Sequence, residues 1–217
     1  MDAQRYAALL TPGRRRVFLL LDHYADGATG ALALASLAAQ WALGTPGSLL
    51  LTALALVFPA GLITYGLNRL CKALLPKPRQ NRPYHALISP WLRGSFPSFH
   101  SQFATTFAAT FITAVTLLVP QEARLPAGGL AGATMGLSVA LVAWSRLYLA
   151  VHDRVDVIGG VVLGALVGAG VAAGAIWAGW VPTGALAWAG VAGLVGTVLA
   201  VSLWERRKRR SAGEAPD

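Results

Sequence analysis

The segment V155-DVIGGVVLGALVGAGVAAGAI-W177 decides the fold class of this chain. Its one ionisable residue, Asp156, stands at the start, and no charged residue follows before Trp177. A helix rises about 1.5 Å per residue, so about 20 apolar residues cross the roughly 30 Å hydrocarbon core of a bilayer. The segment therefore predicts a transmembrane helix.

The rest of the chain has the same character. Of its 217 residues 55% are hydrophobic and 12% are charged, and the mean hydropathy is +0.56, whereas soluble domains carry about 25% charged residues. We predict an all-α protein, a six-span transmembrane helix bundle. The expected spans are residues 27–43, 48–75, 98–119, 127–149, 155–177 and 182–204.

These spans divide the chain into three parts. Residues 1–26 are either an interfacial helix or a frayed tail, residues 27–204 form the membrane domain, and residues 205–217 are a basic tail. The net charge of +9 fits contact with anionic lipid headgroups. The basic run 206–210 is most simply an anchor after the last span, because no RNA-binding motif accompanies it, so no nucleic-acid partner is expected.

Glycine recurs at every fourth position in two of the predicted spans. Small residues at this spacing let helix backbones approach closely, so we predict packing within the bundle. The two rows are Gly128, Gly132 and Gly136, and Gly160, Gly164 and Gly168.

Three polar clusters fall at one face of the predicted bundle. They are residues 72–80 (KALLPKPRQ), 95–101 (SFPSFHS) and 145–156 (SRLYLAVHDRVD). An even number of spans places both termini at this same face. Ionisable residues at span ends are costly unless paired or solvated, so the clusters predict an active site there.

The clusters contain the groups that bind a phosphate. Pro97 suits the first turn of a helix, whose unpaired N–H groups and dipole attract an anion, and Ser98 and His100 lie beside it. Arginine holds phosphate in a bidentate way. Further positive charge comes from Lys72, Arg79 and Arg146. Together these residues predict a pocket for a phosphoryl group.

The third cluster also supplies a nucleophile. His152 and Asp156 are four residues apart, which places both on one helix face. A carboxylate on one imidazole nitrogen fixes the tautomer and leaves the other nitrogen free to attack. With His100 the set holds a nucleophile, an acid/base and an orienting group. No Cys, His and Asp cluster has the spacing of a metal cage, so we expect no metal or other cofactor and assign charge stabilisation to the cations.

A family resemblance adds to this interpretation. The spacing within residues 145–156, Ser-Arg, five residues, His, three residues, Asp, resembles the third signature of the type 2 phosphatidic acid phosphatase superfamily. Residues 96–101 resemble its second signature and residues 72–79 its first. The resemblance covers residues 72 to about 164, with the remainder matching only as membrane spans.

The resemblance implies a role for each site residue. His152, oriented by Asp156, attacks phosphorus to form a phosphohistidine, while His100 protonates the leaving oxygen and then activates water. No metal is required in the family's phosphatases. The implied phosphate ligands are Lys72, Arg79, Arg146, Ser98 and the backbone N–H of Phe99.

The chain departs from the family's pattern twice. Phe99 stands where the second signature normally has glycine; Phe fits badly if positive φ is needed, and crowds the pocket if only a helical N–H is needed. The first signature normally ends Arg-Pro, whereas here Arg79 is followed by Gln80, so Arg82 is an alternative ligand in a shifted register.

Single residues also have simpler explanations. Arg146 alone fits an interfacial anchor and His152 alone a satisfied polar group, but three ordered clusters at one face make coincidence a poor explanation. Four other ionisable residues are expected in loops, at the interface or on the surface: His23, His85, Asp153 and Arg154.

We therefore predict an integral membrane lipid phosphatase. Its substrate is a lipid phosphomonoester or diphosphate, such as phosphatidic acid, phosphatidylglycerophosphate or a prenyl phosphate or diphosphate. The alternatives are a phosphotransferase acting on a lipid acceptor, and a non-catalytic lipid-binding or transport protein disabled at Phe99. A vanadate haloperoxidase is disfavoured, because those enzymes are soluble and larger.

Charge also predicts sidedness. Apart from the three proposed phosphate ligands, 15 Lys and Arg residues remain, and only Arg124 lies on the face opposite the clusters. Basic residues of short loops stay cytoplasmic, so we expect the active site and both termini on the cytoplasmic side of a bacterial inner membrane, although many bacterial relatives are thought to face outward. The oligomeric state is left open.

Overall fold

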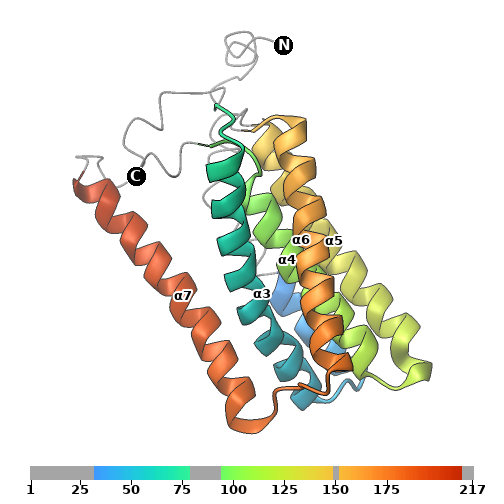
Figure 1. Ribbon diagram of the computed structural model, residues 1–217. Helices are drawn as coiled ribbons and strands as arrows, with labels where there is room; N and C mark the ends of the chain where they lie inside the picture. Colours follow the sequence, from blue (N-terminus) through green and yellow to red (C-terminus); the bar gives the residue numbers. More distant parts are fainter. Residues whose placement is uncertain (1–31, 79–93, 149–151, 212–217) are drawn as a thin grey trace.

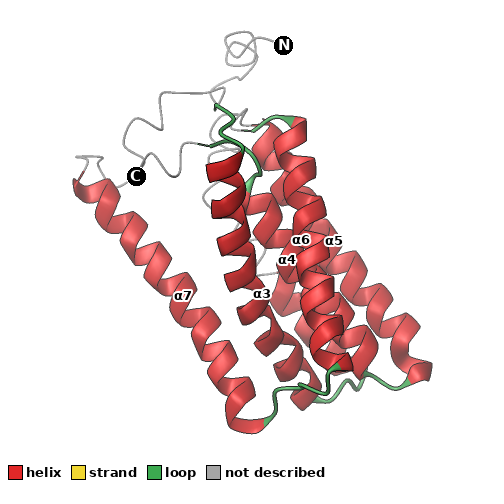
Figure 2. Cartoon of the chain, viewed as in Figure 1, coloured by secondary structure: helices red, strands yellow, loops and turns green. Residues whose placement is uncertain are grey.

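The computed structural model of the chain describes residues 32–78, 94–148 and 152–211, and every regular element in these ranges is helical (Figures 1 and 2). A helix at Leu32–Ala42 precedes α3. The remaining elements are α3 (Gly47–Leu74), α4 (Phe99–Leu118), the short 3₁₀ helix η2 (Gln121–Ala123), α5 (Arg124–Tyr148), α6 (Arg154–Trp177) and α7 (Gly184–Ser211). The all-α prediction is confirmed.

The helices fall on the predicted spans. Among the described residues α3, α4, α5 and α6 are long and apolar enough to cross a membrane. The first and sixth predicted spans contain shorter apolar helical stretches, Leu32–Ala42 and Gly184–Thr197. Helix α7 continues through the basic run to Ser211. The predicted interfacial segment, residues 1–26, lies outside the described residues.

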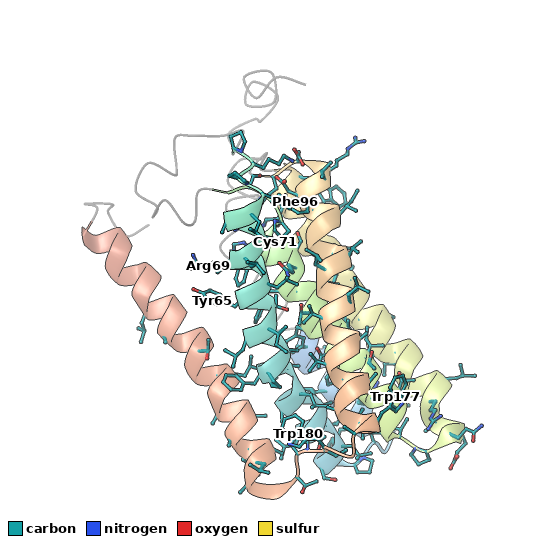
Figure 3. The ribbon with its side chains drawn as sticks, viewed as in Figure 1. Tyr65, Arg69, Cys71, Phe96, Trp177 and Trp180 are labelled. Carbon is teal, nitrogen blue, oxygen red and sulfur yellow. The ribbon has the colours of Figure 1, made fainter. Side chains whose placement is uncertain are left out.

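The helices alternate in direction, which gathers the motif-bearing ends at one end of the bundle (Figure 1). This end holds the C-terminal ends of α3 and α5 and the N-terminal ends of α4 and α6. Trp177 and Trp180 lie at the opposite end (Figure 3), and both are exposed, as interfacial tryptophans are. Helix α4 packs against α3, α5 and α6, whereas α7 packs against α3 and diverges from it toward the motif-bearing end (Figure 1).

The glycine row of α6 brings that helix very close to α4. A Cβ atom added at Gly160 would lie 2.7 Å from Ser98 O, and one at Gly168 would lie 2.5 Å from Thr106 O. The predicted packing is thus present in α6. In α5 it is limited to Gly128, which packs against Thr116; at the other two positions of the row a Cβ would meet no described atom within 4 Å.

Several buried threonine hydroxyl groups have hydrogen-bond partners within the bundle. Thr64 of α3 and Thr106 of α4 are hydrogen-bonded through their hydroxyls at 2.7 Å, and the hydroxyl of Thr110 donates to Thr106 O. A bilayer offers no water for such groups, so bonds between and within helices must satisfy them.

The close contact of α6 with α4 predicts that Gly168→Ala destabilises the protein. The added methyl meets backbone atoms of α4, so the helices must separate, which costs about 1–3 kcal/mol. The matched control is Gly170→Ala in the same helix, where an added Cβ meets no described atom within 4 Å. Thermal unfolding in detergent should give a lower Tm for the first variant only, and equal Tm values would contradict the packing.

Candidate active site

The site is organised around the carboxylate of Asp156, in the first turn of α6. The side chain is 1% exposed. Its Oδ1 lies 2.8 Å from Lys77 Nζ, its Oδ2 lies 3.4 Å from His152 Nδ1, and the hydroxyl of Ser95 donates to Oδ2. A buried charge is stable only when such partners surround it.

The same residue holds the start of α6 in place. Asp153 is the N-cap, and its carboxylate accepts a hydrogen bond from Asp156 N at 3.0 Å while Asp153 N donates to Asp156 Oδ2 at 3.3 Å. This reciprocal capping box satisfies two N–H groups of the first turn. Asp153, which the sequence indicated only as surface charge, is therefore a structural cap.

Lys77 joins the segment after α3 to the start of α6. Its ammonium lies 2.5 Å from Asp153 Oδ2 as well as 2.8 Å from Asp156 Oδ1, and its carbonyl accepts a hydrogen bond from Ser95 N. The sequence placed this lysine in the first cluster but gave it no role. The nearest signal was its position among prolines, five residues after Lys72, where the chain must turn back from a helix end.

The start of α4 differs slightly from the prediction. Helix α4 begins at Phe99, with Ser98 as its N-cap in an extended conformation, so Pro97 lies outside the first turn. The reason is that Ser98 N donates to Asp156 O at 2.9 Å, which holds Ser98 against α6 instead of in the helix. Asn68 of α3 fixes the same turn from the other side, because its Nδ2 donates to Pro97 O at 3.2 Å.

Phe99 takes the backbone conformation of a helix rather than positive φ, since it is the first residue of α4. The sequence left two possibilities at this position, a backbone with positive φ or a helical N–H. The structure has the helical N–H. The Phe99 ring meets Tyr65 edge-on at 6.2 Å between centroids and lies 5.8 Å from Phe103. His100, which follows, is exposed and meets the Phe99 ring at 6.1 Å.

Two of the proposed phosphate-binding cations are buried at this end of the bundle. Lys72 near the end of α3 is 6% exposed, and Arg146 near the end of α5 is 4% exposed. Lys72 packs against Gly94, where an added Cβ would lie 3.1 Å from Lys72 Cβ, and the next residue, Ser95, contacts Asp156. Arg146 Nε donates to Ser145 Oγ at 3.2 Å.

Several residues named from the sequence lie outside the described ranges. They are Arg79, its alternative Arg82, and the two histidines His23 and His85. The described part of the site contains the other seven predicted residues, and all of them stand at or beside the same helix ends: Lys72, Ser98, Phe99, His100, Arg146, His152 and Asp156.

This arrangement combines an oriented imidazole with buried positive charge. Asp156 Oδ2 faces Nδ1 of His152, and this contact orients the imidazole ring. Lys72 and Arg146 are typical ligands for a phosphoryl group. Within the described ranges no group of three or more His, Cys, Asp or Glu side chains is placed to hold a metal ion.

The Lys77 bridge predicts a pH-dependent loss of stability in Lys77→Met. Burial lowers the pKa of Lys77, but hydrogen bonds and charges of Asp153 and Asp156 outweigh it and raise the pKa above the ordinary 10.5. A raised pKa means that the bridge stabilises the folded protein fully below pH 10.5 and is lost as the pH rises through the higher folded-state pKa.

Thermal unfolding in detergent should therefore show Lys77→Met a few degrees below the wild type at pH 8, with the difference shrinking above pH 10.5. Arg154→Met removes an exposed cation at the same helix start and is the matched control, for which we expect no such pH dependence. A Lys77→Met deficit that stays constant up to pH 12 would contradict the bridge.

The chain matches the model of a known protein family. The model of a family described as the PAP2 superfamily matches residues 46–182. These residues run from just before α3 to just before α7 and include all three polar clusters. No curated protein and no solved structure matches the chain.

Proposed function

Because the chain belongs to the PAP2 superfamily and is thus in general a phosphoester hydrolase, we propose that it is a membrane lipid phosphatase acting through a phosphohistidine on His152. The observation that carries the proposal is the pairing of His152 Nδ1 with the buried carboxylate of Asp156 at 3.4 Å. Catalytic hydrogen bonds are often this long before a substrate binds and tighten in the reacting complex.

In the first step the phosphoryl group is bound and transferred. Lys72 and Arg146, together with Arg79, neutralise the phosphoryl oxygens, and the N–H groups at the start of α4 add hydrogen bonds. His152 Nε2 forms a bond to phosphorus as the bond to the leaving oxygen breaks. The developing imidazolium charge is stabilised by Asp156, much as a buried carboxylate supports histidine in other enzymes.

In both steps His100 moves the proton. It stands at the exposed start of α4, where it donates a proton to the departing lipid oxygen. It then removes a proton from the water that attacks the phosphohistidine, which releases inorganic phosphate and restores His152. Proton transfer of this kind contributes about 10²–10⁴-fold to the rate.

The membrane setting supports a lipid substrate. Four helices of the described chain are long and apolar enough to cross a bilayer, and the candidate site lies at one end of them. A lipid phosphate places its headgroup at that depth while its chains remain in the hydrocarbon. Substrates of this kind include phosphatidic acid, phosphatidylglycerophosphate and prenyl phosphates or diphosphates.

We expect purified protein in detergent to release inorganic phosphate from a panel of lipid phosphates without added metal. His152→Ala removes the nucleophile and should abolish release, and His100→Ala should reduce it by about 10²-fold or more. Rapid acid-free quenching with labelled substrate should trap phosphate on wild-type protein, in a bond stable to alkali, and none on His152→Ala. Undiminished release by His152→Ala would eliminate the mechanism, and transfer to an added lipid acceptor in place of release would indicate a phosphotransferase.

We also propose that the active site faces the cytoplasm of a bacterial inner membrane, on the strength of the charge distribution. In a Cys71→Ala background, Ser211→Cys at the end of α7 should react with an impermeant maleimide only after lysis. Gln121→Cys, exposed at the opposite end of the bundle, should react in intact cells. The reverse pattern would place the site outside.

A further inference from the structure

Arg69 is a cation inside a membrane-spanning helix that none of the steps above uses. It lies five residues before the end of α3 at Leu74, which is about 7.5 Å along the helix axis. A charge at such a depth is costly unless it is paired or reaches the interface, and an intramembrane cation is by default a candidate for function. The residue is half-buried.

The guanidinium of Arg69 is held by Tyr65, one turn earlier on α3. Its Nη2 donates to Tyr65 Oη at 2.6 Å, and its central carbon lies 4.8 Å from the centre of the ring. Both side chains project from the side of α3 on which α7 lies in Figure 3. Tyr65 is 48% exposed, so a ligand at the surface of α3 can reach this pair.

Aromatic contacts connect this pair to the site. Tyr65 meets Phe99 edge-on, and Phe99 meets His100 edge-on, with centroids 6.2 and 6.1 Å apart. His100 is the residue that serves the leaving oxygen in the proposed mechanism. A continuous row of ring contacts therefore runs from Arg69 through Tyr65 and Phe99 to His100.

Helix α3 thus presents two cations one turn apart, in different surroundings. Lys72 is 6% exposed and packs against Gly94, inside the phosphoryl site. Arg69 is about 4.5 Å away along the helix axis and rotated about 60° toward the outside. Of these two cations, a substrate with one phosphate needs only Lys72. A substrate with two phosphates has one phosphate for Lys72 and a second for Arg69.

We propose that Arg69 binds the phosphate that remains on the lipid when a lipid diphosphate is hydrolysed, and that a lipid diphosphate is the preferred substrate. The inference rests on the proposed function. His152 Nε2 bonds to the terminal phosphorus, the bond from that phosphorus to the bridging oxygen breaks, and the electron pair leaves with the lipid monophosphate. Arg69 stabilises the charge that develops on this leaving group, and Tyr65 is a positioning residue for the guanidinium.

The test compares farnesyl diphosphate with farnesyl phosphate, which share one hydrocarbon chain, on full-length protein in detergent. We expect Arg69→Gln to lower kcat/KM about tenfold or more for the diphosphate and less than about threefold for the monophosphate. Arg69→Lys should restore part of the ratio of kcat/KM for the diphosphate to kcat/KM for the monophosphate. Tyr65→Phe, which keeps the ring and loses the hydroxyl, should lower the ratio in the same direction by a smaller factor.

Arg154→Gln, at an exposed position of α6, is the matched control and should leave the diphosphate-to-monophosphate ratio unchanged. Equal losses on both substrates in Arg69→Gln, or no loss on either, would overturn the role of Arg69 while leaving the phosphatase intact. Absence of hydrolysis of any lipid phosphate by the wild type would instead overturn the proposed function. Should Arg69→Gln fail to fold, a diphosphate-to-monophosphate ratio of kcat/KM that is unchanged in Tyr65→Phe would overturn the role.

Discussion

The buried carboxylate of Asp156 is the group on which the other features of this end of the bundle depend. Its carboxylate accepts hydrogen bonds from Lys77 and Ser95 and faces Nδ1 of His152. Its backbone carbonyl accepts a hydrogen bond from Ser98 N. When one partner of a buried charge is removed, the remaining partners no longer compensate that charge fully. One residue of α6 therefore fixes the positions of the segment after α3, the start of α4 and the loop that carries His152.

The glycine row of α6 makes this network geometrically possible. Gly160 lies one turn beyond Asp156 and packs directly on the carbonyl of Ser98. With a larger residue there, α6 would stand farther from α4, and Ser98 N could not remain 2.9 Å from Asp156 O. In a bilayer, helices associate through close packing because no hydrophobic effect drives them together. Here the same close packing also sets the geometry of the site.

Hydropathy predicted the helices well because the bilayer imposes a length on each span, and α3, α4 and α6 begin and end within one residue of the prediction. The contact of His152 with Asp156 was predicted, but its reason was wrong: the two residues do not share a helix face, because α6 begins at Arg154 with Asp153 as its N-cap and His152 lies before it. The role of Lys77 was missed because it depends on the path of a proline-containing segment between two helices, which no periodicity encodes. Pro97 was placed in the first turn of α4 but lies two residues before the helix begins, because a tertiary hydrogen bond from Ser98 to α6 holds Ser98 as the N-cap.

Phe99 and Arg69 are best understood together. A glycine at the start of α4 would offer its N–H with no side chain, and the helical backbone of Phe99 offers the same N–H. The added ring has a different consequence, because it contacts Tyr65 of α3 and Phe103 of α4. The residue that departs from the family's pattern thus lies between the Tyr65–Arg69 pair and His100, and its ring contacts both Tyr65 and His100.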